Sequence, residues 1–202
     1  RRRPVPIGTQ HSVVSRLVPG ARRDHARAMA EGILLPPISR DVLLPEETRL
    51  ARLDAALPQI DAVVAEETDA VALEATLACL LWEVLSHANF CGFYRRVGPR
   101  TLAVGPYQGS MGCLRIDFDR GVCGACARTR EVQRIDDVHA FPGHIACDPR
   151  SRSELVVPVV AGGELRAVLD VDSPHLAAFS AAEADRVHAL VRRTFDRAGV
   201  VF

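Results

Sequence analysis

Four of the six cysteines in this chain fall in one stretch of the sequence: Cys113, Cys123, Cys126 and Cys147. Cys147 lies in a segment rich in proline and glycine, close to four basic residues: His139, His144, Arg150 and Arg152. Basic neighbours lower the pKa of a thiol, although the adjacent Asp148 acts in the opposite direction. A reactive thiol with other thiols nearby to resolve its oxidised form is typical of a redox catalyst. We therefore predict a redox role for Cys147.

The remaining cysteines have simpler interpretations. Cys79 sits in a leucine-rich segment and Cys91 in an apolar one, so both are predicted to be small buried residues. Cys123 lies near a predicted helix start, where the backbone amides favour a thiolate. Cys123 and Cys126 also form a CxxC motif. A zinc site would need a second ligand pair, which Cys147 and a nearby histidine supply only loosely. A thioredoxin-type centre would need a βαβ context, which is absent.

Three acidic residues form a second candidate group. Glu154 precedes an apolar strand, and Asp170 and Asp172 end another one. Asp170 and Asp172 are two residues apart, so their side chains project from the same face of that strand. Neighbouring carboxylates repel each other and lose hydration, a cost that a cationic ligand offsets. The alternative is that both are solvated turn residues before Pro174, and the sequence leaves the two interpretations open.

The apolar spacing indicates which elements position these groups. Leucines between residues 50 and 64 predict a helix that Pro58 can interrupt, and a stronger helix follows over 73–85. Two hairpins are predicted, the first over 90–107 and the second over 155–171, with glycines at both turns. Between them we expect a short helix from 121, a strand over 131–135 and a loop over 136–153. Ser180 and Glu183 form a capping box that begins a C-terminal helix.

This order predicts an α+β domain with a central antiparallel sheet, terminal helices on one face and a long active-site loop. We expect the domain to span residues 45–202, after an extension of residues 1–44 that carries Arg and Pro and packs through residues 33–35. The formal net charge is zero, which argues against a nucleic-acid binder, and no apolar run is long enough to span a membrane. Six cysteines are too few for a secreted disulfide scaffold, so a cytoplasmic location is expected.

Seven short segments of the chain, taken together, resemble the free methionine-R-sulfoxide reductases, which are built on a GAF-type domain. The resemblance covers roughly residues 70–195 and is carried by segments 92–94, 105–109, 121–124, 137–139, 141–148, 153–154 and 169–173. The most specific of them read FPGHIACD, GVCG and LDVDS. Most GAF domains bind cyclic nucleotides, haem or bilins and lack this set of cysteines.

The resemblance implies a role for each matching residue. Cys147 matches the cysteine that attacks the sulfoxide sulfur and becomes a sulfenic acid, and Cys113 matches the one that resolves it as a disulfide. Cys123 matches a third cysteine with a supporting or exchange role. The substrate's ammonium group is held by the carboxylates that match Glu154, Asp170 and Asp172. Aromatic residues at the positions of Phe90 and Tyr94 surround the methyl-sulfinyl group.

Three positions depart from the family pattern. Phe90 replaces a usual tryptophan, which predicts a looser aromatic wall, while Cys91 and Cys126 are additional thiols. Cys126 leaves the path of thiol exchange open. The extension over residues 1–44 lies outside the match.

The sequence thus predicts an oxidoreductase that reduces free L-methionine (R)-S-oxide. No metal or cofactor is expected, thioredoxin or another dithiol would be the reductant, and the family resemblance implies a homodimer. Thiolate attack at sulfur needs a proton for the departing oxygen, which a carboxylic acid of raised pKa can donate. The alternative is a GAF module that binds a ligand or senses redox state without turnover. A third hypothesis is a structural zinc site with a protein-interaction role.

Overall fold

A computed structural model of the chain describes residues 35–36, 38–40, 42–144 and 147–202. Most of the predicted extension, with Ile33 and Leu34, lies outside these residues, as do Ile145 and Ala146 of the FPGHIACD segment. Leu35, the described part of the 33–35 segment, packs against the main hydrophobic core. None of the described helices is long and apolar enough to cross a membrane.

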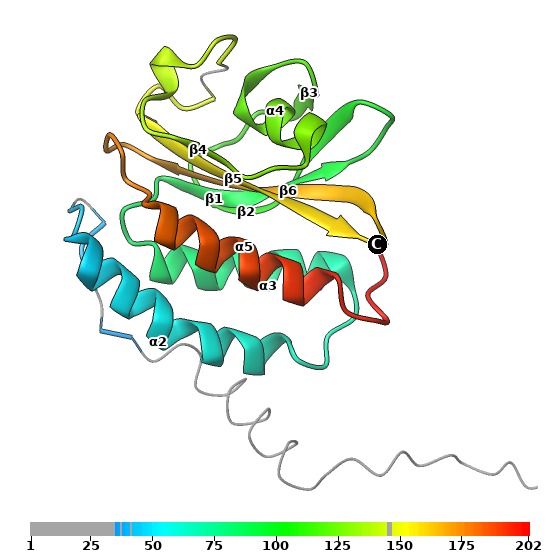
Figure 1. The fold of residues 1–202 in the computed structure, drawn as a ribbon, viewed down its shortest axis with the longest axis horizontal. Helices are drawn as coiled ribbons and strands as arrows, with labels where there is room; N and C mark the ends of the chain where they lie inside the picture. Colours follow the sequence, from blue (N-terminus) through cyan, green and yellow to red (C-terminus); the bar gives the residue numbers. More distant parts are fainter. Residues whose placement is uncertain (1–34, 37, 41, 145–146) are drawn as a thin grey trace, which may run out of the picture.

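The described chain forms a single sheet with helices on both faces (Figure 1). Three helices cover one face: α2 (Glu46–Val64), α3 (Ala70–Val84) and α5 (Ala181–Phe195). The short helix α4 (Gly121–Thr129) lies over the opposite face together with the long loop. The prediction of terminal helices on one face is therefore confirmed, and the second face carries the irregular part of the chain.

Six antiparallel strands make up the sheet in the order β3-β2-β1-β6-β5-β4. The two predicted hairpins are present, and β1 pairs with β6 in the middle of the sheet to join them. The strands are β1 (Phe90–Arg96), β2 (Thr101–Gly109), β3 (Arg115–Asp117), β4 (Gln133–Ile135), β5 (Ser153–Ala161) and β6 (Glu164–Ser173). The strand β3 was not predicted from the sequence, because three residues are too few to show an alternating pattern.

Alternation along the strands produces two hydrophobic cores. On β1, Cys91 and Phe93 face the three helices, and Phe90 and Tyr94 face α4. The strand β6 alternates in the same way, with Leu169 and Val171 on the helical side. The even-numbered positions of β6 therefore point into the layer between the sheet and α4, where the candidate chemistry lies.

The structure answers one open question about the helices and corrects one expectation. The helix α2 continues through Pro58, so the proline removes one backbone donor without ending the helix. Cys79 is exposed rather than buried, because it lies on the outer side of α3, whereas Leu77 and Ala78 face the core. Cys91 is buried as predicted. The capping box of Ser180 and Glu183 is confirmed at the start of α5.

A buried ion pair fastens α5 to α2. Arg49 donates two hydrogen bonds to the Glu183 carboxylate, at 2.9 and 2.8 Å, and the two side chains are only 9% and 1% exposed. Burial alone would raise the pKa of Glu183, but the bonds from Arg49 and from the backbone of Ser180 lower it. Glu183 is therefore ionised and depends on Arg49.

Substituting Arg49 by alanine leaves that carboxylate buried without its partner. We expect Arg49→Ala to lower the free energy of unfolding by about 3–5 kcal/mol, measured by urea denaturation. The matched control is Arg193→Ala, which breaks a more exposed pair between α5 and α2 with Asp61. That change should cost less than about 1 kcal/mol. Equal costs for the two variants would contradict this account of α5 docking.

Candidate active site

A small cavity lies between the α4 face of the sheet and the two segments that carry Cys113 and Cys147. Its volume is about 30 Å³, which is room for about one water molecule. The residues singled out from the sequence line it, except for Cys113, which is bonded to one of the lining residues. The lining ones are Phe90, Tyr94, Cys123, Cys147, Glu154, Asp170 and Asp172. The fold thus brings together groups that are far apart in the sequence.

The register of the central strands places the three acids side by side. Asp172 on β6 pairs with Phe90 on β1 and with Glu154 on β5, so these residues form one row across the sheet. Asp170 lies two residues before Asp172, on the same face. Glu154 and Asp170 are 6% and 5% exposed. Asp172 is partly exposed, but it lies within β6 and pairs with β1 and β5. The alternative interpretation, in which both aspartates are solvated turn residues, is therefore wrong.

Burial of this cluster favours its protonated forms. Burial raises the pKa of Glu154 well above its usual range, and the charges of Asp170 and Asp172 raise it further. The pKa of Asp170 rises to about 7 through burial, even though hydrogen bonds from Glu154 and Cys123 act to lower it. The pKa of Asp172 is also raised, first by burial and then by Asp170. The cluster therefore retains protons at neutral pH and is able to donate one.

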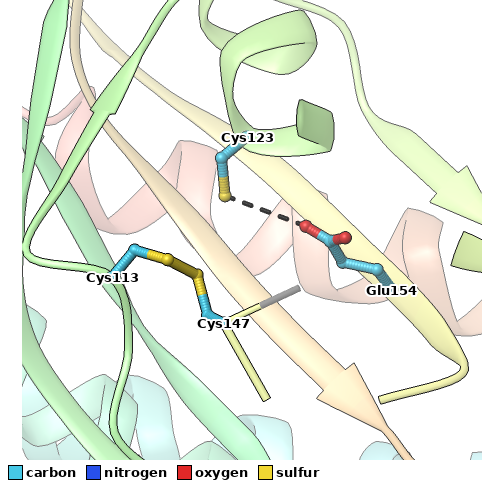
Figure 2. The surroundings of a disulfide bond; sticks show 4 residues. All are labelled: Cys113, Cys123, Cys147 and Glu154. Carbon is cyan, nitrogen blue, oxygen red and sulfur yellow. Dashed lines mark hydrogen bonds between the residues drawn. A yellow bond between two sulfur atoms is a disulfide. The ribbon is translucent and has the colours of Figure 1, made fainter. Parts of the chain in front are cut away.

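Cys123 lies on α4, and its side chain points toward Glu154 of the acidic cluster (Figure 2). Its Sγ is 3.8 Å from Oε1 of Glu154 and the residue is buried. Burial, followed by the charges of Asp170 and Glu154, raises the pKa of this thiol well above its usual range. The expectation that a helix start favours a thiolate at Cys123 is therefore wrong, because burial beside carboxylates outweighs the helix amides.

Gly124 lets α4 pack closely against the end of β3. A Cβ at this position would lie 2.6 Å from the carbonyl oxygen of Asp117 and 2.7 Å from that of Phe118. The Cys126 side chain does not join the acidic cluster, and its Sγ lies 3.8 Å from the carbonyl oxygen of Val156. Among the described residues, the group able to hold a metal omits Cys126, so the CxxC motif does not form the zinc site considered from the sequence.

A disulfide joins Cys113, which follows β2, to Cys147 in the long loop, as Figure 2 shows. The Cα atoms are 5.4 Å apart, although 34 residues separate the two cysteines in the sequence. Both residues are partly exposed. This is the pairing that the family resemblance implies. His144 also lines the cavity, and burial together with His139 lowers its pKa.

Aromatic residues form one wall of the cavity. The ring of Phe90 stacks on Tyr107 at 5.4 Å and lies 6.1 Å from the ring of Tyr94. The Tyr94 hydroxyl accepts a hydrogen bond from the backbone N–H of Cys113. Tyr94 therefore helps to hold the disulfide segment as well as lining the cavity. Tyr107 therefore supports the ring of Phe90.

Asn89, the only asparagine in the chain, connects both cysteine-bearing segments. Its side-chain Nδ2 donates to Oδ2 of Asp148 and to Oγ of Ser151, each at 3.0 Å. Its backbone carbonyl accepts from the N–H of Ser110 at 2.9 Å, and its own N–H donates to the carbonyl of Asp172 at 2.9 Å. This role was not predicted from the sequence, although an asparagine directly before a predicted strand was a usable signal.

Gly109 lets the chain turn around Asn89. It has a φ of +95°, and a Cβ there would lie 2.3 Å from the carbonyl oxygen of Asn89. On the other side, Asp148 is buried and bonded by Arg150, with a shortest distance of 2.7 Å. Hydrogen bonds from the Arg150 side chain hold the pKa of Asp148 well below its usual range. Arg150 therefore neutralises the negative charge of Asp148 and does not act as an independent cation beside Cys147.

Comparisons with known proteins agree with this geometry. The GAF domain family model matches residues 70–193. Free methionine-R-sulfoxide reductase of Escherichia coli (strain K12) is 43% identical over 131 residues, which cover 65% of this chain and 79% of that protein. Protein YtsP of Bacillus subtilis (strain 168) is 46% identical over 119 residues, 58% of this chain and 73% of that one.

A solved structure is similar over most of the sheet and helices. The X-ray structure of free methionine-R-sulfoxide reductase from Neisseria meningitidis, in complex with its substrate, has a TM-score of 0.69 and 41% sequence identity. The match covers 72% of this chain and 87% of that chain. The chain therefore belongs to the GAF domain family and, within it, to the free methionine-R-sulfoxide reductases. The GAF-type α+β fold expected from the sequence is confirmed.

If Asn89 holds the two cysteine segments together, its loss should weaken the disulfide. We expect Asn89→Ala to shift the equilibrium with a glutathione buffer toward the reduced form by about tenfold, because the effective concentration of one thiol at the other falls. The fraction of disulfide is measured by alkylation of free thiols. Gln133→Ala, which removes an exposed amide on β4, should leave the equilibrium unchanged. A wild-type equilibrium in Asn89→Ala would show that Asn89 does not position the cysteines.

Proposed function

We propose that this chain reduces free L-methionine (R)-S-oxide to methionine by thiol chemistry at Cys147. The observation that carries the proposal is the juxtaposition of the Cys113–Cys147 disulfide with a buried acidic cluster in one cavity. The names of the Escherichia coli and Neisseria meningitidis relatives support both the substrate and the R configuration at sulfur.

The acidic cluster is the proposed binding site for the substrate's ammonium group. Glu154, Asp170 and Asp172 lie in adjacent positions of the sheet, and burial makes an unpaired negative charge there costly. An ammonium ion supplies both the positive charge and the hydrogen-bond donors that these carboxylates need. Methionine sulfoxide within a peptide lacks that group, and each lost charge-assisted hydrogen bond costs about 1.5–3 kcal/mol. The site therefore selects the free amino acid.

Catalysis begins when the Cys147 thiolate attacks the sulfoxide sulfur. The oxygen takes up a proton, for which the raised pKa of Asp170, about 7, provides a donor at neutral pH. Methionine leaves and the oxygen remains on Cys147 as a sulfenic acid. The substrate sulfur gains two electrons and the Cys147 sulfur loses two. Phe90 and Tyr94, which line the same cavity, enclose the methyl-sulfinyl group.

The second half of the cycle regenerates the thiols. The Cys113 thiol attacks the sulfenic sulfur, water leaves, and the Cys113–Cys147 disulfide forms. A thioredoxin-like dithiol then reduces this disulfide, becomes a disulfide itself and leaves two thiols, so no bound cofactor is needed. Met111 and Leu114, which flank Cys113, are 74% and 73% exposed and offer the reductant an apolar contact. The disulfide form has a cavity of only about 30 Å³, so the substrate enters the reduced form. A homodimer stays a prediction from the family resemblance.

The test compares Cys147→Ser with wild-type protein on free methionine sulfoxide and a dithiol, with methionine measured by chromatography. We expect turnover by wild type and a loss of at least about 1,000-fold in Cys147→Ser, because no other group replaces the nucleophile. Cys79→Ser, which removes an exposed thiol on α3, should retain wild-type turnover.

Two results would contradict the proposal. Turnover by Cys147→Ser at the wild-type rate would remove Cys147 from the chemistry. If the wild-type protein produced no methionine but still formed the disulfide reversibly, the result would favour the alternative, a redox-sensing GAF module without turnover.

A further inference from the structure

Cys123, Glu154 and Asp170 form a compact group of three metal-ligating side chains. One ligand atom from each, a sulfur and two carboxylate oxygens, lies within 4.8 Å of the others. The three residues come from α4, β5 and β6, and all are buried. The group is therefore held by regular elements of the fold rather than by a loop, and the Cys123 Sγ lies 3.8 Å from Oε1 of Glu154.

An unpartnered atom points to a ligand at this position. Asp170 is 5% exposed, and its carboxyl group accepts hydrogen bonds from Glu154 and Cys123. Its Oδ1, however, has no hydrogen-bond partner within the part of the chain that the structure describes. A buried carboxylate oxygen without a donor is costly. Asp170 also lines the cavity, which has a volume of about 30 Å³. That space holds about one water molecule, so it is too small for an amino acid but has room for a metal ion.

We propose that Cys123, Glu154 and Asp170 bind one Zn²⁺ ion, with water in the fourth position. A thiolate with two carboxylates is a donor set that suits zinc, and three protein ligands with an open position form a common tetrahedral arrangement. This site differs from the CxxC site considered from the sequence, because it uses Cys123 without Cys126. It also requires neither Cys113 nor Cys147, so it is available in the disulfide form.

Zinc at this position regulates the enzyme. Zinc occupies two of the carboxylates that the substrate's ammonium group needs. Zinc and free methionine therefore compete for the site. This competition rests on the proposed function. Binding removes the protons that Cys123 and the acids hold, and each is released to solvent. The affinity for zinc therefore rises as the pH rises.

The direct test titrates the disulfide-bonded protein with zinc chloride and follows binding by calorimetry, with bound metal counted by elemental analysis. In this form Cys113 and Cys147 are not available as ligands. We expect one Zn²⁺ per chain and a higher affinity at pH 8 than at pH 6. Cys123→Ser and Glu154→Gln should each weaken binding by more than about 100-fold, since even changes outside the ligand shell cost 10–100-fold.

Two cysteine variants serve as matched controls. Cys126→Ser removes the neighbouring buried thiol of α4, and Cys79→Ser removes an exposed one. Both should bind zinc as wild type does. Absence of zinc binding by the wild-type protein would overturn the proposal, as would binding that survives Cys123→Ser and Glu154→Gln. Urea unfolding curves of each variant establish that it is folded.

A competition experiment separates this inference from the proposed function. It uses Cys113→Ser/Cys147→Ser protein, which has neither the disulfide nor the reactive thiol, and free methionine as the competing ligand. Methionine should weaken zinc binding. If zinc binds through Cys123 and methionine has no effect, the metal site stands and the ammonium site fails. If the wild type reduces methionine sulfoxide but binds no zinc, the function stands and the metal site fails.

Discussion

The pairing of β1 with β6 is the constraint on which the site depends. It joins the two hairpins into one sheet and sets Phe90 opposite Asp172 and Gly92 opposite Asp170. A shift of one residue would turn both aspartates toward the apolar core beneath the three helices. The Phe93 and Leu169 side chains occupy that core, so apolar burial on one face fixes the acidic face on the other.

Two further constraints bring the cysteines to this face. Asn89, placed directly before β1, bonds both the segment after β2 and the loop that carries Cys147. On the opposite side, Gly124 lets α4 pack closely against the end of β3, and the Cys123 Sγ on α4 lies 3.8 Å from Oε1 of Glu154. Among the described residues, no cationic side chain forms an ion pair with Glu154, Asp170 or Asp172. A visiting cation, whether an ammonium group or a metal ion, stabilises this acidic cluster, and this requirement links the proposed substrate with the proposed zinc site.

Much of this arrangement could be predicted from the sequence, because it follows from local patterns. The alternation of β6 placed Asp170 and Asp172 on one face, and the capping box located the start of α5. The pairing of Cys113 with Cys147 came only from the family resemblance. Properties set by long-range packing were missed. Burial beside acids from β5 and β6 raises the pKa of the Cys123 thiol. The role of Asn89 depends on contacts with residues far along the chain.

The central claim is that the buried acids recognise a free ammonium group beside the reactive thiol. Comparing the reduction of free methionine sulfoxide with that of N-acetylmethionine sulfoxide tests it most directly, because acetylation removes the charge and leaves the sulfoxide unchanged. The account predicts that kcat/KM for the acetylated compound falls by at least about 100-fold, the equivalent of two lost charge-assisted hydrogen bonds. Similar values for the two compounds would contradict it.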